Sequence, residues 1–271
     1  MKPRPFDYTR PDTADEAVAL LAEHGDEARI LAGGQSLMAM MNLRLADPAM
    51  LIDIARIAEL GHISDLGDRI EVGAAVTQNK LLAWPGLKAK LPLLAAALPH
   101  VGHFQTRNRG TICGSIAHAD PSSEIPLSLA VLEGDIVLRG KRGERVLKAA
   151  DFQLDMLTTA READELIVAV RFPVHKAGVA FREAARRHGD FAIVAVAALV
   201  ESDGRVRLGV GGMAATPVVR RIAPGGVKEG VEKLARELEG YEDLHASAEL
   251  RRDILRNLAP VVIAEAQSCA A

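Results

Sequence analysis

Two separated loops of small residues constrain this chain more than any other feature. The first, Ala32-Gly33-Gly34-Gln35-Ser36, follows the apolar run Arg29-Ile30-Leu31, and the second extends from Arg109 to Glu124. Glycines permit positive φ angles and a close approach to backbone N–H groups, which can hold a pyrophosphate without lysine or arginine. Gly-Gly alone is also typical of a plain strand-to-helix turn. Two such loops together predict one large ligand that carries phosphates.

The apolar content of the chain bounds its size and setting. At 271 residues and 49% hydrophobic composition, it can bury one sizeable core or two modest ones. The longest apolar run, Phe191 to Val200, is ten residues, which is far short of the roughly 20 that cross a bilayer as a helix. The first residues lack the apolar region of a signal peptide. We therefore expect no membrane span and a cytoplasmic location.

Charge and cysteine usage exclude several other classes. The 33 basic and 36 acidic residues are mixed along the chain and give a net charge of -3, so no basic face predicts nucleic-acid binding. The two cysteines, Cys113 and Cys269, are too few for an iron–sulfur cluster, which normally takes four thiolates. Histidines at 100, 103 and 118 lack metal-ligand spacing. His118 and Asp120 could form a catalytic pair, but such residues more often support their own loop.

Hydrophobic periodicity predicts α/β alternation first and an antiparallel region later. The predicted helices cover 13–24, 37–45, 77 onward, 91–100, 125–132, 227–239 and 247–267. The predicted strands cover 28–32, 50–54, 60–62, 69–73, 135–139, 144–148, 165–172, 178–186, 191–202 and 205–211. In the last helix, apolar residues recur every four positions and suit packing on a sheet: Leu250, Ile254, Leu258, Val262 and Ala266.

Three motifs, in this order, resemble those of a known family. They are Ala32 to Ser36, Asn108 to Pro121, and Arg186-Arg187-His188-Gly189-Asp190-Phe191-Ala192. Together they resemble the FAD-binding medium subunit of molybdenum hydroxylases, the carbon monoxide dehydrogenase and xanthine dehydrogenase family. The resemblance covers nearly the whole chain and includes Phe6-Asp7-Tyr8 and Ala215-Thr216-Pro217.

The resemblance implies a fold and a division into domains. The fold class is α+β, with a two-subdomain FAD-binding fold of the vanillyl-alcohol-oxidase (PCMH) type. A C-terminal domain would add a three-stranded antiparallel sheet with helices. The implied domains are 1–175, with subdomains of about 1–57 and 58–175, and 176–271.

The resemblance also assigns cofactor-binding residues, while no catalytic or metal-binding residue is expected on this chain. The residues expected at the pyrophosphate are Ile30, Leu31, Ala32, Gly33, Gly34, Gln35, Ser36, Leu37, Thr111, Ile112, Cys113, Gly114 and Ser115. Glu124 would bind the adenosine ribose, and Val101 would contact the cofactor. Ile167 and Arg182 would approach the flavin, and Phe191 would lie beside its ring. Without the resemblance, Val101 and Ile167 would be interpreted as core residues. Arg182 would be interpreted as part of a solvated face, and Glu124 as an acid that stabilises the N-terminus of its helix.

Cys113 departs from the family pattern, which usually has Thr-Ile-Gly-Gly followed by Ser or Asn. A cysteine at the first of those glycines must avoid a positive φ or accept strain. We expect a small buried side chain, as is typical of free cysteines. A redox thiol and covalent flavin attachment are the alternatives.

The function implied is electron transfer. FAD on this chain would take electrons from a small [2Fe-2S] subunit and pass them to an external acceptor, while a large molybdopterin subunit hydroxylates the substrate. The expected assembly is a dimer of heterotrimers, and the motif variants favour an aromatic N-heterocycle as substrate. A stand-alone FAD-dependent oxidoreductase and a non-catalytic nucleotide-binding scaffold are the alternatives.

Overall fold

A small parallel sheet forms the N-terminal lobe (residues 2–57) of the computed structural model, which describes residues 2–270. The strand order is β1-β3-β2, with bounds β1 (Asp7–Thr9), β2 (Ala28–Leu31) and β3 (Met50–Asp53). The helices are α1 (Ala14–His24), the 3-10 turn η1 (Gly25–Glu27) and α2 (Leu37–Asn42). Thr13 begins α1 because its side chain accepts a hydrogen bond from Glu16 N. The α/β alternation predicted here is confirmed.

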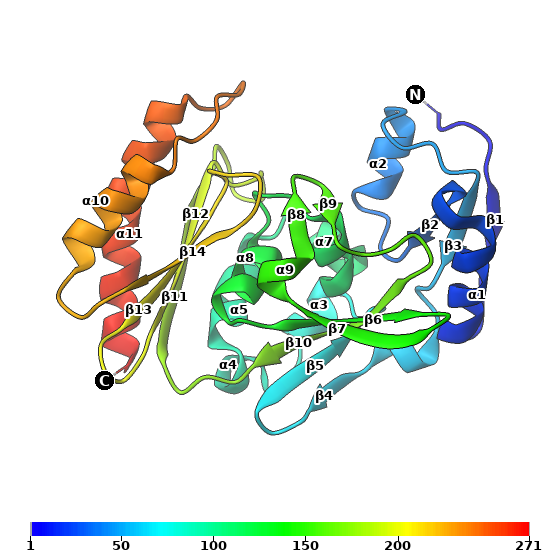
Figure 1. Ribbon diagram of the computed structural model, residues 1–271, viewed down its shortest axis with the longest axis horizontal. Helices are drawn as coiled ribbons and strands as arrows, with labels where there is room; N and C mark the ends of the chain where they lie inside the picture. Colours follow the sequence, from blue (N-terminus) through cyan, green and yellow to red (C-terminus); the bar gives the residue numbers. More distant parts are fainter. Residues whose placement is uncertain (1, 271) are drawn as a thin grey trace.

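An antiparallel sheet of five strands occupies the middle of the molecule (Figure 1). Its order is β4 (Ile63–Asp65), β5 (Arg69–Gly73), β10 (Leu166–Pro173), β6 (Asp135–Gly140) and β7 (Gly143–Lys148). The predicted hairpin is confirmed in β6 and β7, which pair up to Gly140 and Gly143. In β10 the register shifts between Ile167 and Ala169, a bulge that re-aims side chains at this point.

Short helices and turns surround this middle sheet. They are η2 (Ala58–Gly61), α3 (Gln78–Leu82), α4 (Leu87–Lys90), α5 (Pro92–Ala97), η3 (Leu98–His100), α6 (Phe104–Arg109), α7 (Ile112–His118), α8 (Glu124–Val131) and α9 (Ala149–Phe152). A two-stranded ribbon, β8 (Gln153–Asp155) and β9 (Thr158–Thr159), follows α9. The strand predicted at 60–62 was wrong, because residues 58–61 form the 3-10 turn η2.

The segment expected as one loop from Arg109 to Glu124 contains the helix α7, so that expectation was wrong. Thr111 begins the helix, because its hydroxyl accepts a hydrogen bond from Gly114 N over 2.9 Å. Ile112, Cys113 and Ile116 are buried. A glycine inside so short a helix masks the pattern in the sequence.

The C-terminal sheet has four strands rather than the three expected. They are β11 (Gly178–Ala184), β12 (Val194–Val200), β13 (Val206–Gly211) and β14 (Val218–Ile222), all antiparallel and in this order. The additional strand β14 escaped the sequence pattern because it exposes Arg220 and Arg221 in its middle. The helices α10 (Val227–Glu237) and α11 (Ala248–Ala270) cover one face of this sheet (Figure 1).

Strand β12 is buried on both faces, which explains its uninterrupted apolar sequence. Val194, Val196 and Ala198 belong to the core under α10 and α11, whereas Ala195 and Ala197 face the core shared with the middle sheet. The close fit on that second face extends to β13, where a Cβ at Gly209 would lie 2.2 Å from Val131 Cγ2 of α8. The C-terminal sheet is therefore packed firmly on the rest of the chain.

Within residues 2–270, no helix is long and apolar enough to cross a membrane.

Candidate functional site

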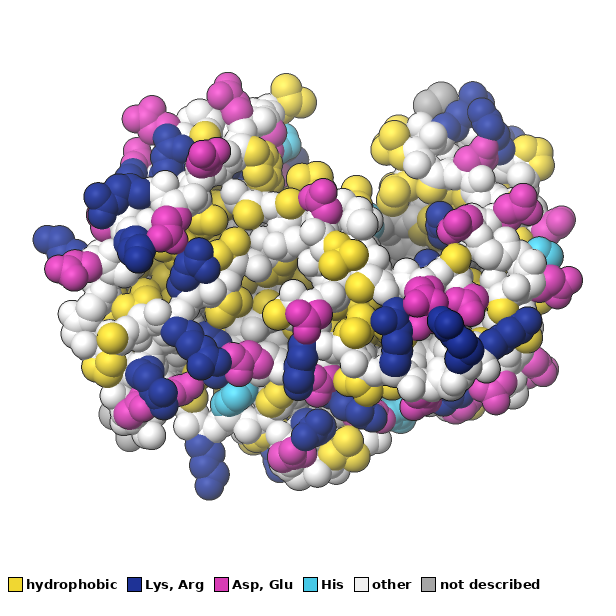
Figure 2. Space-filling model, in the orientation of Figure 1, with side chains coloured by type: hydrophobic (Ala, Val, Ile, Leu, Met, Phe, Trp, Pro, Cys, Tyr) yellow, Lys and Arg dark blue, Asp and Glu magenta, His cyan; other side chains and the backbone are white. Residues whose placement is uncertain are grey.

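A cavity of about 630 Å³ lies between the N-terminal lobe and the middle of the molecule. Figure 2 shows the surface hollowed between these two parts. Residues from the loop after β2, from α7 and from β10 line this cavity, so the two glycine-containing loops face one space. The sequence predicted that convergence, and the structure confirms it.

The two loops touch at Gly33. A Cβ at this position would lie 2.2 Å from the carbonyl oxygen of Arg109 and 2.8 Å from Gly110 Cα, far inside van der Waals contact. Gly34 has a φ of +70°, a conformation that L side chains rarely adopt. The first loop therefore needs glycine at two successive positions for different reasons, namely contact at Gly33 and backbone angle at Gly34.

The second loop is fixed by the segment that precedes α3. Thr77 and Thr111 form an isolated antiparallel bridge. Ile112 N donates to Val76 O over 3.1 Å, and Gln78 N donates to Gly110 O over 2.8 Å. These backbone bonds hold the start of α7 at the cavity wall.

Most of the residues predicted to bind the cofactor line this cavity. Those that do are Ile30, Ala32, Gly33, Gly34, Gln35, Ser36, Leu37, Val101, Thr111, Cys113, Gly114, Ser115, Glu124, Ile167 and Phe191. Leu31, Ile112 and Arg182 are not among the lining residues. Ile112 is fully buried in the core, and Arg182 forms an ion pair with Glu265 of α11. The structure thus brings the motif residues together but leaves Arg182 on a different surface.

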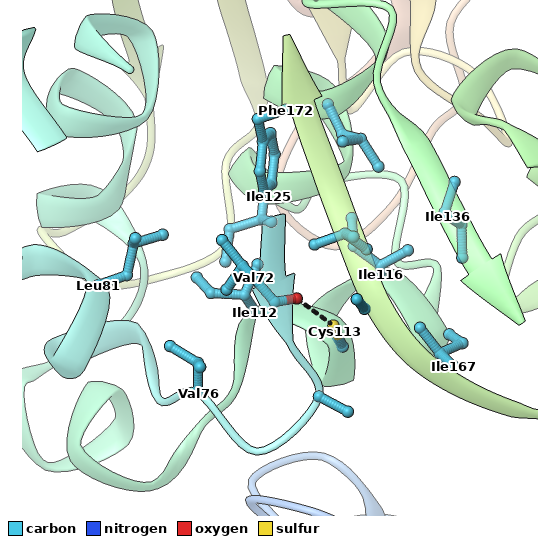
Figure 3. Packing of buried hydrophobic residues seen from close by; sticks show 14 of the residues in the cluster. Val72, Val76, Leu81, Ile112, Cys113, Ile116, Ile125, Ile136, Ile167 and Phe172 are labelled. Atoms are coloured by element: carbon cyan, nitrogen blue, oxygen red, sulfur yellow. Dashed lines mark hydrogen bonds between the residues drawn. The ribbon is translucent and has the colours of Figure 1, made fainter. Parts of the chain in front are cut away.

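Cys113 avoids backbone strain because it lies within α7. Its thiol is packed among Val72, Ile116 and neighbouring apolar side chains and donates a weak hydrogen bond to Val72 O over 3.6 Å (Figure 3). Burial raises the pKa of this thiol far above its ordinary value. Cys113 is therefore a small buried side chain, as expected, and its environment disfavours the thiolate, which is the reactive form.

We expect thiol reagents to separate the two cysteines cleanly. In the folded chain, the exposed Cys269 should react with a maleimide or aromatic disulfide while the buried Cys113 stays unmodified. Denaturation should release the second thiol. Peptide mapping after timed labelling measures this, and rapid modification of Cys113 in the folded chain would contradict the packing role.

Glu124, at the start of α8, is a buried acid of the cavity wall. Only 7% of its surface is exposed. Burial is the main cause that raises its pKa to about 8, and the charges of Glu183 and Asp120 act in the same direction. At neutral pH the carboxyl group therefore holds its proton and can both donate and accept hydrogen bonds.

We expect Glu124→Gln to remove a pH-dependent loss of stability. The folded-state pKa lies above the ordinary 4.5, so the folded chain binds more protons and loses stability as the pH rises towards 8. Each pKa unit is worth ~1.4 kcal/mol, so the free energy of unfolding should differ by a few kcal/mol between the two pH limits. Urea unfolding of the flavin-free chain at pH 5 and pH 8.5 measures it. Equal pH profiles for wild type and variant would refute the raised pKa.

Asp120 has the supporting role in its loop that the sequence favoured. Asp120 Oδ1 accepts a hydrogen bond from Ser122 N over 2.8 Å and so closes the turn after α7. His118 lines the cavity, and burial lowers its pKa. Neither residue is paired with the other in a hydrogen bond across residues 2–270.

Several polar lining residues were not predicted from the sequence, and Gln78, Arg29 and Arg161 are three of them. Gln78 begins α3, while Arg29 and Arg161 add positive charge to the wall. Burial lowers the pKa of Arg161, whose Nη1 donates to the carbonyl oxygens of Glu162 and Glu165. None of the three belongs to a recognisable motif, so the sequence carries no signal for them.

The fold and the cavity together define a class of protein. A small parallel lobe stands against an antiparallel sheet, and the space between them is walled by glycine-rich backbone. This is the FAD-binding fold of the vanillyl-alcohol-oxidase type with an added C-terminal sheet. The cavity volume of about 630 Å³, the close backbone approach at Gly33 and the buried hydrogen-bonding groups of Glu124 and Gln78 fit FAD.

Comparisons with known proteins agree. Residues 4–175 match the family model of the FAD binding domain in molybdopterin dehydrogenase, and residues 179–266 match that of the CO dehydrogenase flavoprotein C-terminal domain. The chain is 41% identical to caffeine dehydrogenase subunit beta of a Pseudomonas species, covering 76% of this chain and 70% of that one. It is 34% identical to the 6-hydroxypseudooxynicotine dehydrogenase complex subunit alpha of Paenarthrobacter nicotinovorans, covering 98% and 96%.

A solved structure shares the entire architecture. The carbon monoxide dehydrogenase of Hydrogenophaga pseudoflava superposes with a TM-score of 0.94 at 33% identity and covers all of both chains. The chain therefore belongs to the FAD-binding medium subunits of the molybdenum hydroxylases, the carbon monoxide dehydrogenase and xanthine dehydrogenase family. It is an FAD-binding oxidoreductase subunit, and the family resemblance and fold expected from the motifs are confirmed.

Proposed function

We propose that this chain carries electrons, through FAD, from a small [2Fe-2S] subunit to an external acceptor. Substrate oxidation would take place on a large molybdopterin subunit, in a dimer of heterotrimers. The observation that carries the proposal is the convergence of both glycine loops on one cavity at the Gly33 contact. The cysteine content supports the division of labour, because two cysteines cannot hold an iron–sulfur cluster.

The cavity residues are proposed to hold FAD in the roles that the motifs indicate. The loop from Ile30 to Leu37 and the start of α7 would bind the pyrophosphate, and Glu124 would bind the ribose. Bound FAD supplies a group that exchanges one or two electrons. The chain itself fixes the cofactor, keeps water from its buried parts and leaves one end accessible.

The residues at the opening of the cavity favour a partner chain that covers it. Phe191 lines the cavity yet is 68% exposed, and Leu157 at the same cavity is also exposed. Exposed apolar side chains beside a functional opening are typical of an interaction surface. A neighbouring subunit at this mouth would bring its redox centre close to the flavin.

The proposed division of the chain is 1–175 for FAD binding, with subdomains of about 1–57 and 58–175, and 176–271 for the C-terminal domain. The ends of the two family-model matches, at 175 and 179, support this boundary. The end of β3 at Asp53 supports the division near 57.

The proposed substrate of the complex is an aromatic N-heterocycle. The support is the identity of 41% to a caffeine dehydrogenase subunit, against 36% to a carbon monoxide dehydrogenase medium chain. The residues that select the substrate would lie on the large subunit.

Purification followed by flavin analysis tests the proposal. Acid extraction should release FAD rather than FMN, and the chain should arrive with two other polypeptides, molybdenum and iron. Addition of an N-heterocycle should bleach the flavin absorbance of the complex and leave that of the separated chain unchanged. Turnover by the separated chain would instead establish a stand-alone oxidoreductase. Well-folded protein without flavin absorbance would reject both.

A further inference from the structure

Gln78 occupies a fixed and buried position at the wall of the cavity. It is the first residue of α3, directly after Thr77, whose hydroxyl accepts a hydrogen bond from Lys80 N over 3.1 Å. Its own backbone N donates to Gly110 O over 2.8 Å. Only 5% of the residue is exposed, although it lines the cavity. The backbone therefore aims this side chain with little freedom.

The side-chain amide of Gln78 has no hydrogen-bond partner within residues 2–270. Its Oε1 is buried without a donor, and its Nε2 makes no hydrogen bond to the described part of the chain. A buried amide left without partners is costly, and such groups in native proteins are normally satisfied. Because Gln78 lines the cavity, a ligand bound there can supply the missing partner.

The amide lies beside the contact between the two glycine loops. Both Nε2 and Oε1 of Gln78 are 3.1 Å from the place where a Cβ of Gly110 would lie. Gly110 Cα in turn is 2.8 Å from the place of a Gly33 Cβ. Gln78, Gly110 and Gly33 thus form one continuous wall.

We propose that the Gln78 amide binds a sugar hydroxyl of the cofactor next to its diphosphate. An amide offers a donor and an acceptor together, and a hydroxyl group can satisfy both. The diphosphate has no donor for Oε1, whereas sugar hydroxyls flank it on both sides, on the ribityl chain and on the adenosine ribose. Since Glu124 is assigned to the ribose, the ribityl chain is the favoured source. The inference rests on the assignment of this cavity to FAD.

Such a contact makes Gln78 a positioning residue. It would fix how deeply the flavin end of the cofactor enters the cavity, without contacting the redox-active ring. Its loss should weaken the binding of cofactor fragments that contain the bound sugar and spare those that lack it.

The test compares Gln78→Met with Asn79→Met in the full chain after removal of bound flavin. If the chain cannot be separated from its complex, the complex is used. Methionine keeps the length of glutamine and loses both hydrogen-bonding atoms. Asn79 is the matched control, because this neighbouring amide bonds Asn108 and does not line the cavity. Dissociation constants are measured by calorimetry for FAD, FMN and ADP, and thermal unfolding without ligand checks the fold.

We expect Gln78→Met to bind FAD and FMN about tenfold more weakly, a loss of about 1.4 kcal/mol, with ADP binding unchanged. Weaker FAD and ADP with unchanged FMN would support a sugar hydroxyl but place it on the ribose. Equal weakening of all three ligands would overturn the proposal in favour of a phosphate contact. Unchanged affinities, or the same loss in Asn79→Met, would also overturn it. Wild-type protein that binds no FAD would instead reject the assignment of the cavity.

Discussion

Replacing Gly33 with alanine should leave a folded chain that no longer retains FAD. The added Cβ would lie 2.2 Å from Arg109 O and 2.8 Å from both Arg109 C and Gly110 Cα. All three are backbone atoms, so no side chain can rotate away to make room. The backbone of Gly33 is outside the positive-φ region, and the substitution therefore acts by separating the two loops alone.

The size of the effect follows from the cost of overpacking. Extra carbon in a closely packed site typically costs about 1–3 kcal/mol, and here that cost falls on the arrangement that brings both loops to the ligand. A loss of about 2.8 kcal/mol corresponds to a hundredfold rise in the dissociation constant. Flavin absorbance relative to protein absorbance in the purified sample gives the occupancy, and titration of FAD into the flavin-free chain gives the constant.

Gly61→Ala is the matched control for this experiment. Gly61 has no positive φ, and a Cβ there would meet only Lys80 Nζ at 3.8 Å, which is ordinary contact. The control should retain full flavin occupancy. If Gly33→Ala retained FAD with the wild-type dissociation constant, the contact between the loops would have no part in cofactor binding.

The elements that the sequence predicted well are those whose pattern is local. The hairpin of β6 and β7 is confirmed because glycines at 140 and 143 mark its turn. The run of β12 is confirmed because burial on both faces leaves no polar residue in it. In the site, the small residues of the two loops were identifiable because their chemistry depends on the residue type itself.

The remainder depended on contacts that no local pattern records. The buried face of α11 is the clearest example. Apolar residues every four positions predicted that Leu250 faces the sheet, yet it is 46% exposed, while its neighbour Arg251 is only 1% exposed. Leu255 and Ala259 follow Arg251 on that inward face. Val262 and Ala266 are fully buried as predicted, so the buried arginine displaces the apolar pattern only in the first turn of the helix.

Gln78 and Arg182 show the same limit within the site. Gln78 enters the cavity wall only because its segment pairs with Gly110, a residue distant in sequence. Arg182 was expected near the flavin, but its guanidinium is engaged by Glu265 of α11. Both outcomes depend on tertiary partners, which a single sequence does not reveal.

Replacing Arg251 with methionine should cause the largest loss of stability among substitutions in the C-terminal sheet and its helices. The guanidinium donates to the carbonyl oxygens of Tyr241, Ile193 and Gly212 and to Asp243 Oδ2. It also lies 4.1 Å from the ring centroid of Tyr241. Removing one partner of a buried charged network typically costs about 3–5 kcal/mol, because the remaining groups stay buried without partners.

The damage should reach the cofactor site by a defined route. Gly212, one of the groups bonded by Arg251, donates its N–H to Pro121 O over 2.8 Å and so joins the C-terminal sheet to the loop after α7. Ile193, whose carbonyl oxygen also accepts a hydrogen bond from Arg251, lies two residues from Phe191 at the cavity. We therefore expect weaker FAD retention together with the loss of stability.

Arg252→Met separates this network from a general effect of losing an arginine from α11. Arg252 is the next residue of the same helix, is only partly buried and donates to the single carbonyl oxygen of Glu239. Surface changes of this kind are usually within about 0.5 kcal/mol. Urea unfolding should therefore move the midpoint strongly for Arg251→Met and barely for Arg252→Met. Equal shifts of the urea midpoint in the two variants would contradict the prediction. The buried guanidinium would then contribute no more to stability than a surface charge, and the apolar core alone would hold the C-terminal sheet.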